Sequence, residues 1–221
     1  STTYYYRAYA TNSAGTSYGT TRSFLTNSIT IPTISSTTSA SSITQTTAVS
    51  GGTISIDGGS PVIARGVCWS SSTTSPTTSL STKTTDGSGI GTFTSNLSGL
   101  SASTTYYVRA YATNSIGTVY GSYKSFTTSS LTTPTLSSTT AVTSITTNSA
   151  ISGGNITSDG GVTVTARGVC WSSTTTSPTI SLSTKTSDGT GTGAFSSSIT
   201  GLTTKTTYYV RSYATNSRGT T

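Results

Sequence analysis

The sequence has few side chains that could carry acid–base chemistry. Its 221 residues include no histidine and no methionine, and the only acidic residues are Asp57, Asp86, Asp159 and Asp188. Histidine and glutamate are common general acids and bases, and the four aspartates are far apart in the sequence. We therefore expect no enzymatic activity, no cofactor and no catalytic residue.

Cysteine and concentrated charge are also scarce. Cys68 and Cys170 are the only cysteines. They lack the neighbouring histidine or clustered positive charge that would lower a thiol pKa. We expect free, buried thiols, with an intermolecular disulfide as the alternative. The net charge of +7 is spread out, which argues against nucleic-acid binding. No hydrophobic run is long enough to span a membrane.

One motif occurs three times at a spacing of 102 residues. It reads STTYYYRAYATNS from Ser1, STTYYVRAYATNS from Ser103 and KTTYYVRSYATNS from Lys205. The period is the size of a single compact domain. We predict that residues 1–27 are the last two strands of a preceding repeat. Residues 28–129 form a complete repeat, and residues 130–221 form a second repeat without its last strand.

Serine and threonine make up close to half of the chain, which raises the alternative of disorder. However, disordered chains are poor in aromatic and β-branched residues, whereas this chain has 13 tyrosines and many Val, Ile and Thr. Each period reads as about seven short strands separated by Gly, Asp and Asn turns. The pattern predicts all-β, antiparallel β-sandwiches in tandem.

The second half of each repeat resembles a fibronectin type III domain. The stretch GLSASTTYYVRAYATNSIGTVYGSYKSFTT is similar to the last two strands of that family. The spacing from Leu100 to Tyr106, repeated at Leu202 and Tyr208, resembles its tyrosine corner, in which the Tyr hydroxyl bonds to upstream backbone. The resemblance implies an immunoglobulin-like sandwich in which these four residues are structural.

The first half of each repeat departs from that family. The second strand carries Ser-Gly-Gly where the family has a core tryptophan, and Trp69 and Trp171 stand one strand later. We expect the indole to fill the space left by the glycines. The variant with RGVCWS is itself similar to tandem repeats of large secreted and surface proteins of Bacteroidota, which implies an extracellular setting.

One face of the strand near residue 109 predicts a contact surface. Alternation places Tyr107, Arg109 and Tyr111 opposite the apolar face. The same stripe recurs as Tyr209, Arg211 and Tyr213. Cross-strand packing is one interpretation. Cation–π stacking and contact with a sugar or a protein partner are the other.

Other candidate sites have simpler interpretations. The Gly-rich stretch at residues 86–91 has one aspartate, whereas calcium needs several carboxylates. A hairpin turn fits better, and we expect no metal site. An isopeptide bond from Lys83 or Lys124 lacks a nearby acid. Two sequences, at Asn96 and Asn155, match the N-glycan acceptor pattern, and Ser/Thr-rich stretches resemble O-glycosylated stalks.

Both ends fall inside a repeat. One interpretation is that the sequence is a window on a longer array. The alternative is strand exchange, in which residues 18–26 complete a neighbour's unit. The function predicted is a structural segment of a bacterial extracellular filament or long adhesin stalk, whose partners are adjacent copies or glycans. The alternative is a carbohydrate- or partner-binding spacer of a secreted multidomain protein.

Overall fold

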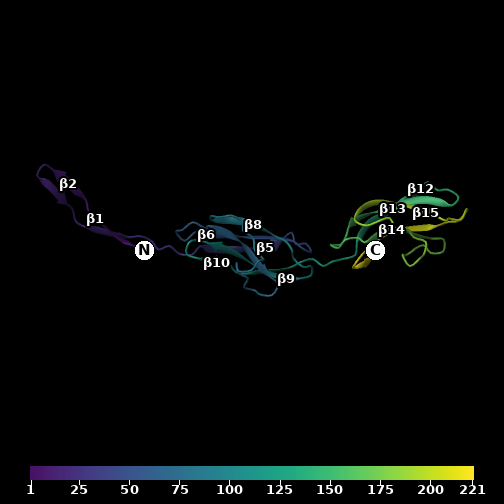
Figure 1. Ribbon diagram of the computed structural model, residues 1–221, viewed down its shortest axis with the longest axis horizontal. Coiled ribbons are helices and arrows are strands. Elements are labelled where there is room, and N and C mark those ends of the chain that lie inside the picture. The colour runs from purple at the N-terminus through teal and green to yellow at the C-terminus, as the bar shows by residue number, and fades with distance from the viewer. The chain divides into compact units, whose positions relative to one another are not determined.

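The computed structural model describes residues 1–221, and all its regular elements are β-strands (Figure 1). The chain divides into two units, Ser1–Ser129 and Ser130–Thr221. Since the chain has no helix, no helical segment is long and apolar enough to cross a membrane.

The first unit contains a complete sandwich. One sheet has the order β5-β6-β8, and the second is built around β9, with β7 on one edge and β10 and β11 along the other. Every pairing is antiparallel. These strands are β5 (Thr33–Ser41), β6 (Ala48–Ile56), β7 (Ala64–Ser70), β8 (Gly91–Leu97), β9 (Thr105–Thr113), β10 (Thr118–Tyr120) and β11 (Lys124–Thr127).

The second unit repeats this arrangement with one difference. Its sheets have the orders β12-β13-β15 and β14-β16-β17. The strand β17 pairs only with the end of β16, at Thr215 and Asn216, and no strand corresponds to β11. The strands are β12 (Thr135–Thr143), β13 (Ser149–Ser158), β14 (Ala166–Ser172), β15 (Gly193–Thr200), β16 (Tyr209–Asn216) and β17 (Gly219–Thr220).

This strand order confirms the predicted fold class, tandem fibronectin type III-like β-sandwiches. In each unit, a three-stranded sheet formed by the first, second and fourth strands packs against a sheet whose centre is the strand of the repeated tyrosine motif. A connection of about twenty residues, 71–90 in the first unit, separates β7 from β8.

The first 27 residues form a two-stranded ribbon. Here β1 (Thr3–Tyr6) pairs with β4 (Arg22–Leu25), and β2 (Tyr9–Asn12) pairs with β3 (Gly15–Tyr18). All residues of these four strands are exposed. The ribbon keeps the register of β9 with β10 and β11, since Tyr4 faces Phe24 as Tyr106 faces Phe126, 102 residues later.

The core of the first unit follows from alternation along its strands. In β9, Val108, Ala110 and Ala112 point to one side and are fully buried. The whole cluster comprises Ala48, Ile54, Val62, Val67, Trp69, Phe93, Leu97, Leu100, Tyr106, Val108, Ala110, Ala112 and Phe126. Burial of these apolar side chains is the main source of stability in a chain so rich in hydroxyl groups.

The prediction that tryptophan fills the space beside the glycines is wrong. A Cβ atom on Gly52 would lie 2.6 Å from the Cβ of Ala110 and 3.2 Å from the ring of Phe93. These two side chains therefore occupy the gap, while Trp69 is buried elsewhere in the same core. In the second unit, Ser212 and Phe195 crowd Gly154 in the same way, rather than Trp171.

Candidate functional site

The tyrosine corner has the geometry of a backbone clamp. The hydroxyl of Tyr106 accepts a hydrogen bond from the amide of Ser101 at 2.9 Å. In the second unit, Tyr208 accepts one from Thr203 at 3.1 Å. Leu100 is buried at the same turn, 4% exposed. These side chains hold the turn that enters the central strand.

The predicted contact surface is only partly exposed. Tyr111 is 4% exposed and Tyr213 7% exposed. The hydroxyls of Tyr111 and Tyr213 donate to the carbonyls of Thr84 and Thr186, each at 2.7 Å. Because the connection that follows β7 or β14 covers these two rings, neither can belong to an exposed contact surface, and the prediction for them is wrong.

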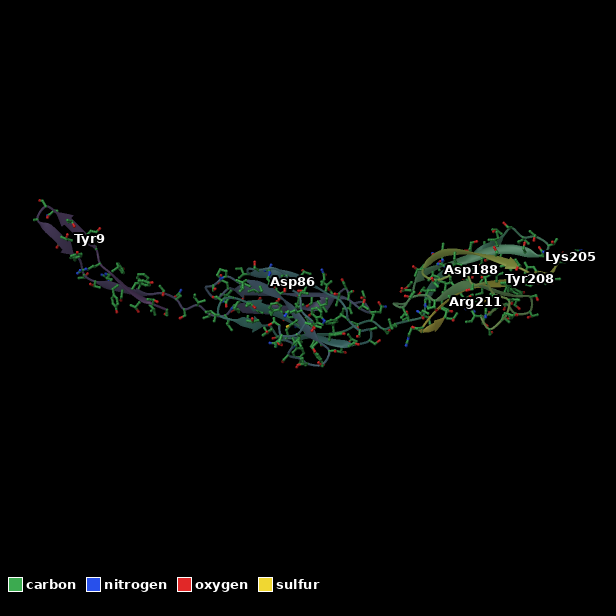
Figure 2. The ribbon with its side chains drawn as sticks, viewed as in Figure 1. Tyr9, Asp86, Asp188, Lys205, Tyr208 and Arg211 are labelled. Carbon is green, nitrogen blue, oxygen red and sulfur yellow. The ribbon has the colours of Figure 1, made fainter.

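The other members of the stripe engage neighbouring strands. Tyr107 meets the ring of Tyr123 edge-on at 5.6 Å. Arg109 donates through Nε to the carbonyl of Gly121 at 2.8 Å and stacks 4.9 Å from the ring of Tyr120. The cation–π contact therefore joins neighbouring strands. In the first unit, the interpretation of Tyr107 and Arg109 as cross-strand packing is the one that fits. In the second unit, Tyr209 is 41% exposed and Arg211 is also exposed (Figure 2).

The connection 71–90 is fixed by a partly buried polar cluster that sequence reasoning missed. The carboxylate of Asp86 accepts hydrogen bonds from the hydroxyls of Thr84 at 2.6 Å and Ser95 at 2.5 Å. Arg65 donates to the carbonyl of Ile90 at 3.0 Å. The second unit has the same cluster around Asp188 (Figure 2). The carboxylates thus anchor a loop through hydroxyl groups, and no group of three or more metal-ligating side chains occurs in the structure.

A second anchor missed from the sequence is Asn114. Its Nδ2 donates to the carbonyls of Thr30 at 2.6 Å and Asp57 at 2.9 Å, while its Oδ1 accepts from the amide of Ile116. Asn216 makes the same two donor contacts in the second unit. The signal was present, since this asparagine is the penultimate residue of every copy of the repeated motif.

The thiols are free and buried, as predicted. The Sγ of Cys68 lies 3.3 Å from the carbonyl oxygen of Pro76, and that of Cys170 lies 3.3 Å from the carbonyl oxygen of Pro178. Burial raises the pKa of the Cys68 thiol to about 11 and raises that of Cys170 as well. A protonated, buried thiol is a weak nucleophile, so both cysteines act as small core side chains.

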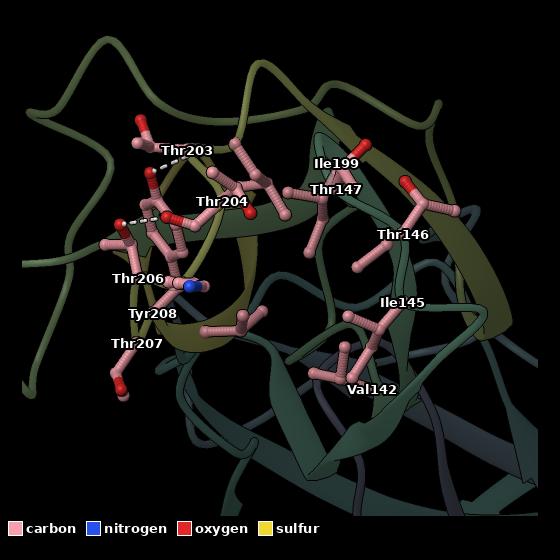
Figure 3. A pocket seen from close by; sticks show the side chains of 14 residues that line it. Val142, Ile145, Thr146, Thr147, Ile199, Thr203, Thr204, Thr206, Thr207 and Tyr208 are labelled. Carbon is pink, nitrogen blue, oxygen red and sulfur yellow. Dashed lines mark hydrogen bonds between the residues drawn. The ribbon is translucent and has the colours of Figure 1, made fainter.

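The second unit has a groove of about 670 Å³ that is lined in part by apolar side chains (Figure 3). Figure 3 shows Val142 and Ile145 on one side and Tyr208 on the other. Ile145 is 72% exposed. The full lining is Val142, Ile145, Thr146, Thr147, Ala150, Ile199, Leu202, Thr203, Thr204, Lys205, Thr206, Thr207, Tyr208 and Val210.

In the first unit the equivalent positions are covered by β11. Phe126 is 7% exposed, belongs to the core and stacks on Tyr106 at 5.8 Å. The groove of the second unit is therefore the place that a final strand fills in a complete sandwich.

Comparison with known proteins supports no closer classification than the fold. No protein-family model and no curated protein matches the chain. The FN1–FN3 domains of chicken CNTN1 share 14% identity over 99% of this chain and 71% of that chain, with a TM-score of 0.32. A two-domain fibronectin type III segment of chicken tenascin shares 16% identity over 86% of this chain and 94% of that chain, with a TM-score of 0.34. The fold assignment rests on the strand order within each unit.

Proposed function

We propose that this chain is a structural segment of a bacterial extracellular filament or of a long adhesin stalk. The observation that carries the proposal is the repetition of one sandwich in structural detail. The hydrogen bond from Tyr111 to Thr84 and its counterpart from Tyr213 to Thr186 have the same length of 2.7 Å. Closely similar units suit a spacer, whose properties depend on the number of repeats.

Several polar side chains of the first unit hold that unit together. Asp86 fixes a loop, Arg109 clamps a neighbouring strand, and Asn114 joins three segments of the backbone. Such internal use favours a mechanical role over chemistry on a substrate.

The extracellular, bacterial setting rests on the resemblance to Bacteroidota surface repeats and on the composition. A surface of hydroxyl groups with few charges is compatible with O-glycosylation in the Ser/Thr-rich connections. In this proposal the partners are adjacent repeats and further copies of the chain.

Negative-stain electron microscopy of the native material, together with its intact mass, tests the proposal. A structural polymer predicts long, uniform fibres with an axial repeat of one or two domains. Short, monodisperse particles with a mass near 22.3 kDa would instead rule out the filament and require a binding-module role to be pursued.

A further inference from the structure

The open groove of the second unit has the shape of a missing strand. In the first unit, Ile43, Leu100 and Val108 occupy the positions of Ile145, Leu202 and Val210, and there they belong to, or pack against, the same core cluster as Phe126. Each of these three groove residues is more exposed than its counterpart in the first unit. What the groove lacks is therefore an extended segment that carries an inward phenylalanine.

The edge of β16 also lacks its backbone partner. In β9, the residues from Thr105 to Val108 pair with β11. Of the corresponding residues 207–210 in the second unit, only Tyr209 and Val210 are paired, on one edge, with β14, and β16 begins at Tyr209. An unpaired edge beside an apolar groove is a site for the addition of a strand.

A segment with the required sequence is present near the start of the chain. Residues 19–27 read GTTRSFLTN, and residues 121–129, which fill the groove in the first unit, read GSYKSFTTS. The glycine, serine, phenylalanine and inward threonine are at the same positions. A basic residue precedes the Ser-Phe pair in both segments, as Arg22 and Lys124.

This segment is held only by its ribbon partner. Phe24 is 53% exposed and stacks on Tyr4, which is 52% exposed. Thr26 donates its amide to the carbonyl of Thr2 at 3.0 Å. Two-stranded ribbons are at best marginally stable in water.

We propose that the groove of the second unit binds the Gly19–Thr26 strand of a second copy of this chain. This inference deepens the proposed filament function and rests on it. Arg22–Leu25 would pair with residues 207–210, which lead into β16, in the register of β11 with β9, so that Phe24 lies on Tyr208. Thr26 would bond to the backbone of Thr203 and Thr206, as Thr128 bonds to Ser101 and Thr104.

The exchange conserves backbone hydrogen bonds and gains buried area. Each bond that β4 loses to β1 would have a counterpart on residues 207–210, because Thr3–Tyr6 and residues 207–210 lie in copies of the same motif. Phe24 passes from a half-exposed position to the environment of Phe126. The driving force is therefore apolar burial of the ring and of the groove lining. Repetition of this contact from one copy to the next gives an open, head-to-tail chain.

Disulfide trapping tests the contact and its register. In the first unit, Ser125 lies directly opposite Tyr107, so the proposed complex places Ser23 opposite Tyr209. Full-length Ser23→Cys and Tyr209→Cys variants are mixed under mild oxidation. Directly opposed strand residues have Cα separations that a disulfide can span. We expect a mixed dimer to form at least about tenfold faster than with Ser17→Cys, an exposed ribbon position outside the contact.

Sedimentation of Phe24→Ala provides a second test without added cysteines. Loss of the ring should weaken self-association at least about tenfold, since the free energy gained by burying a Phe side chain corresponds to a tenfold or larger change in the dissociation constant. The matched control Tyr5→Ala removes an aromatic ring that is 74% exposed and that the contact does not use, so its effect should stay below about twofold.

The outcomes separate the assembly mode from the function. Selective trapping together with loss of association in Phe24→Ala supports the proposal. Fibres that persist in Phe24→Ala, without selective trapping, overturn the exchange and leave the filament function standing; the groove then takes a segment that follows Thr221 in a longer chain, or another partner. A chain that stays monomeric at high concentration and forms no fibres overturns both.

Discussion

Gly52 is the position at which a single methyl group should most clearly disturb the sandwich. It lies in β6, and an added Cβ would lie 2.6 Å from the Cβ of Ala110, 2.9 Å from the carbonyl oxygen of Ser36 and 3.2 Å from the Phe93 ring. Ala110 belongs to the opposite sheet, so that contact requires the sheets to separate, and the contact with Phe93 of the adjacent strand β8 requires its ring to shift. Gly52→Ala should therefore strain the interior of the first unit.

The expected cost follows from two opposing effects. Overpacking a well-packed core costs about 1–3 kcal/mol. The loss of glycine freedom in the unfolded chain returns ~0.4–1 kcal/mol. The net loss is about 0–2.6 kcal/mol, with a middle value of about 1.3 kcal/mol. For a domain of this size, 1 kcal/mol corresponds to a shift in Tm of about 4–8 °C, so the transition of the first unit should fall by several degrees or more. Gly52→Leu should lower it further.

Differential scanning calorimetry is the appropriate assay, because the transition of the second unit serves as an internal reference. Gly117→Ala is a matched control, since the nearest atom to its added Cβ lies at 3.6 Å. The double variant Gly52→Ala with Ala110→Gly removes the closest contact and should recover part of the loss. An unchanged Tm in Gly52→Ala, or no coupling between Gly52 and Ala110, would refute this account of the interior.

Four further predictions test other features. Tyr106→Phe leaves the Ser101 amide without its acceptor and should lower the free energy of unfolding by about 1–2 kcal/mol in denaturant titrations; an unchanged midpoint would contradict a clamping role. Asp86→Ala should make residues 71–90 sensitive to limited proteolysis, whereas wild-type protein should stay intact there. Because burial raises the pKa of Cys68 to about 11, only roughly one thiol in a thousand is ionised at pH 8; its reaction with a disulfide reagent should be slow in the folded protein and rise about tenfold per pH unit up to pH 11, while rapid reaction at pH 8 would show that the thiol is accessible. Addition of millimolar calcium, or of a chelator, should shift Tm by less than about 1 °C, and a larger rise with calcium would reopen the case for a metal loop.

The sequence was sufficient to predict the sandwich and the tyrosine corner, because both depend on local spacing. Alternation in β9 determines which face carries Val108 and Ala110, and the period of 102 residues aligns the units. The covering of Tyr111 could not be predicted in this way. It depends on a hydrogen bond to Thr84, in an irregular connection without periodicity, and a strand pattern distinguishes two faces without showing what lies over each.

The tryptophan error has a similar physical origin. The sequence indicated that the two glycines in β6 leave room, but the side chain that enters that room is decided by how the two sheets face each other. Ala110 comes from the opposite sheet and Phe93 from the adjacent strand β8. Likewise, the open groove becomes visible only when the lining of the second unit is compared with the position of Phe126 in the first.

The ribbon at residues 1–27 has a consequence for how such an array folds. It holds the register of β9 with β11 without any other strand of a sandwich, through contacts between residues only about twenty positions apart. Short loops close fastest, so this ribbon can form as soon as both of its strands have been synthesised. Because successive ribbons are nearly identical, an early ribbon can be captured by the wrong neighbour, which is a characteristic failure of repeat proteins. Sequence differences between adjacent repeats, such as Leu25 in place of Thr127, then bear on folding fidelity rather than on the final stability of any one unit.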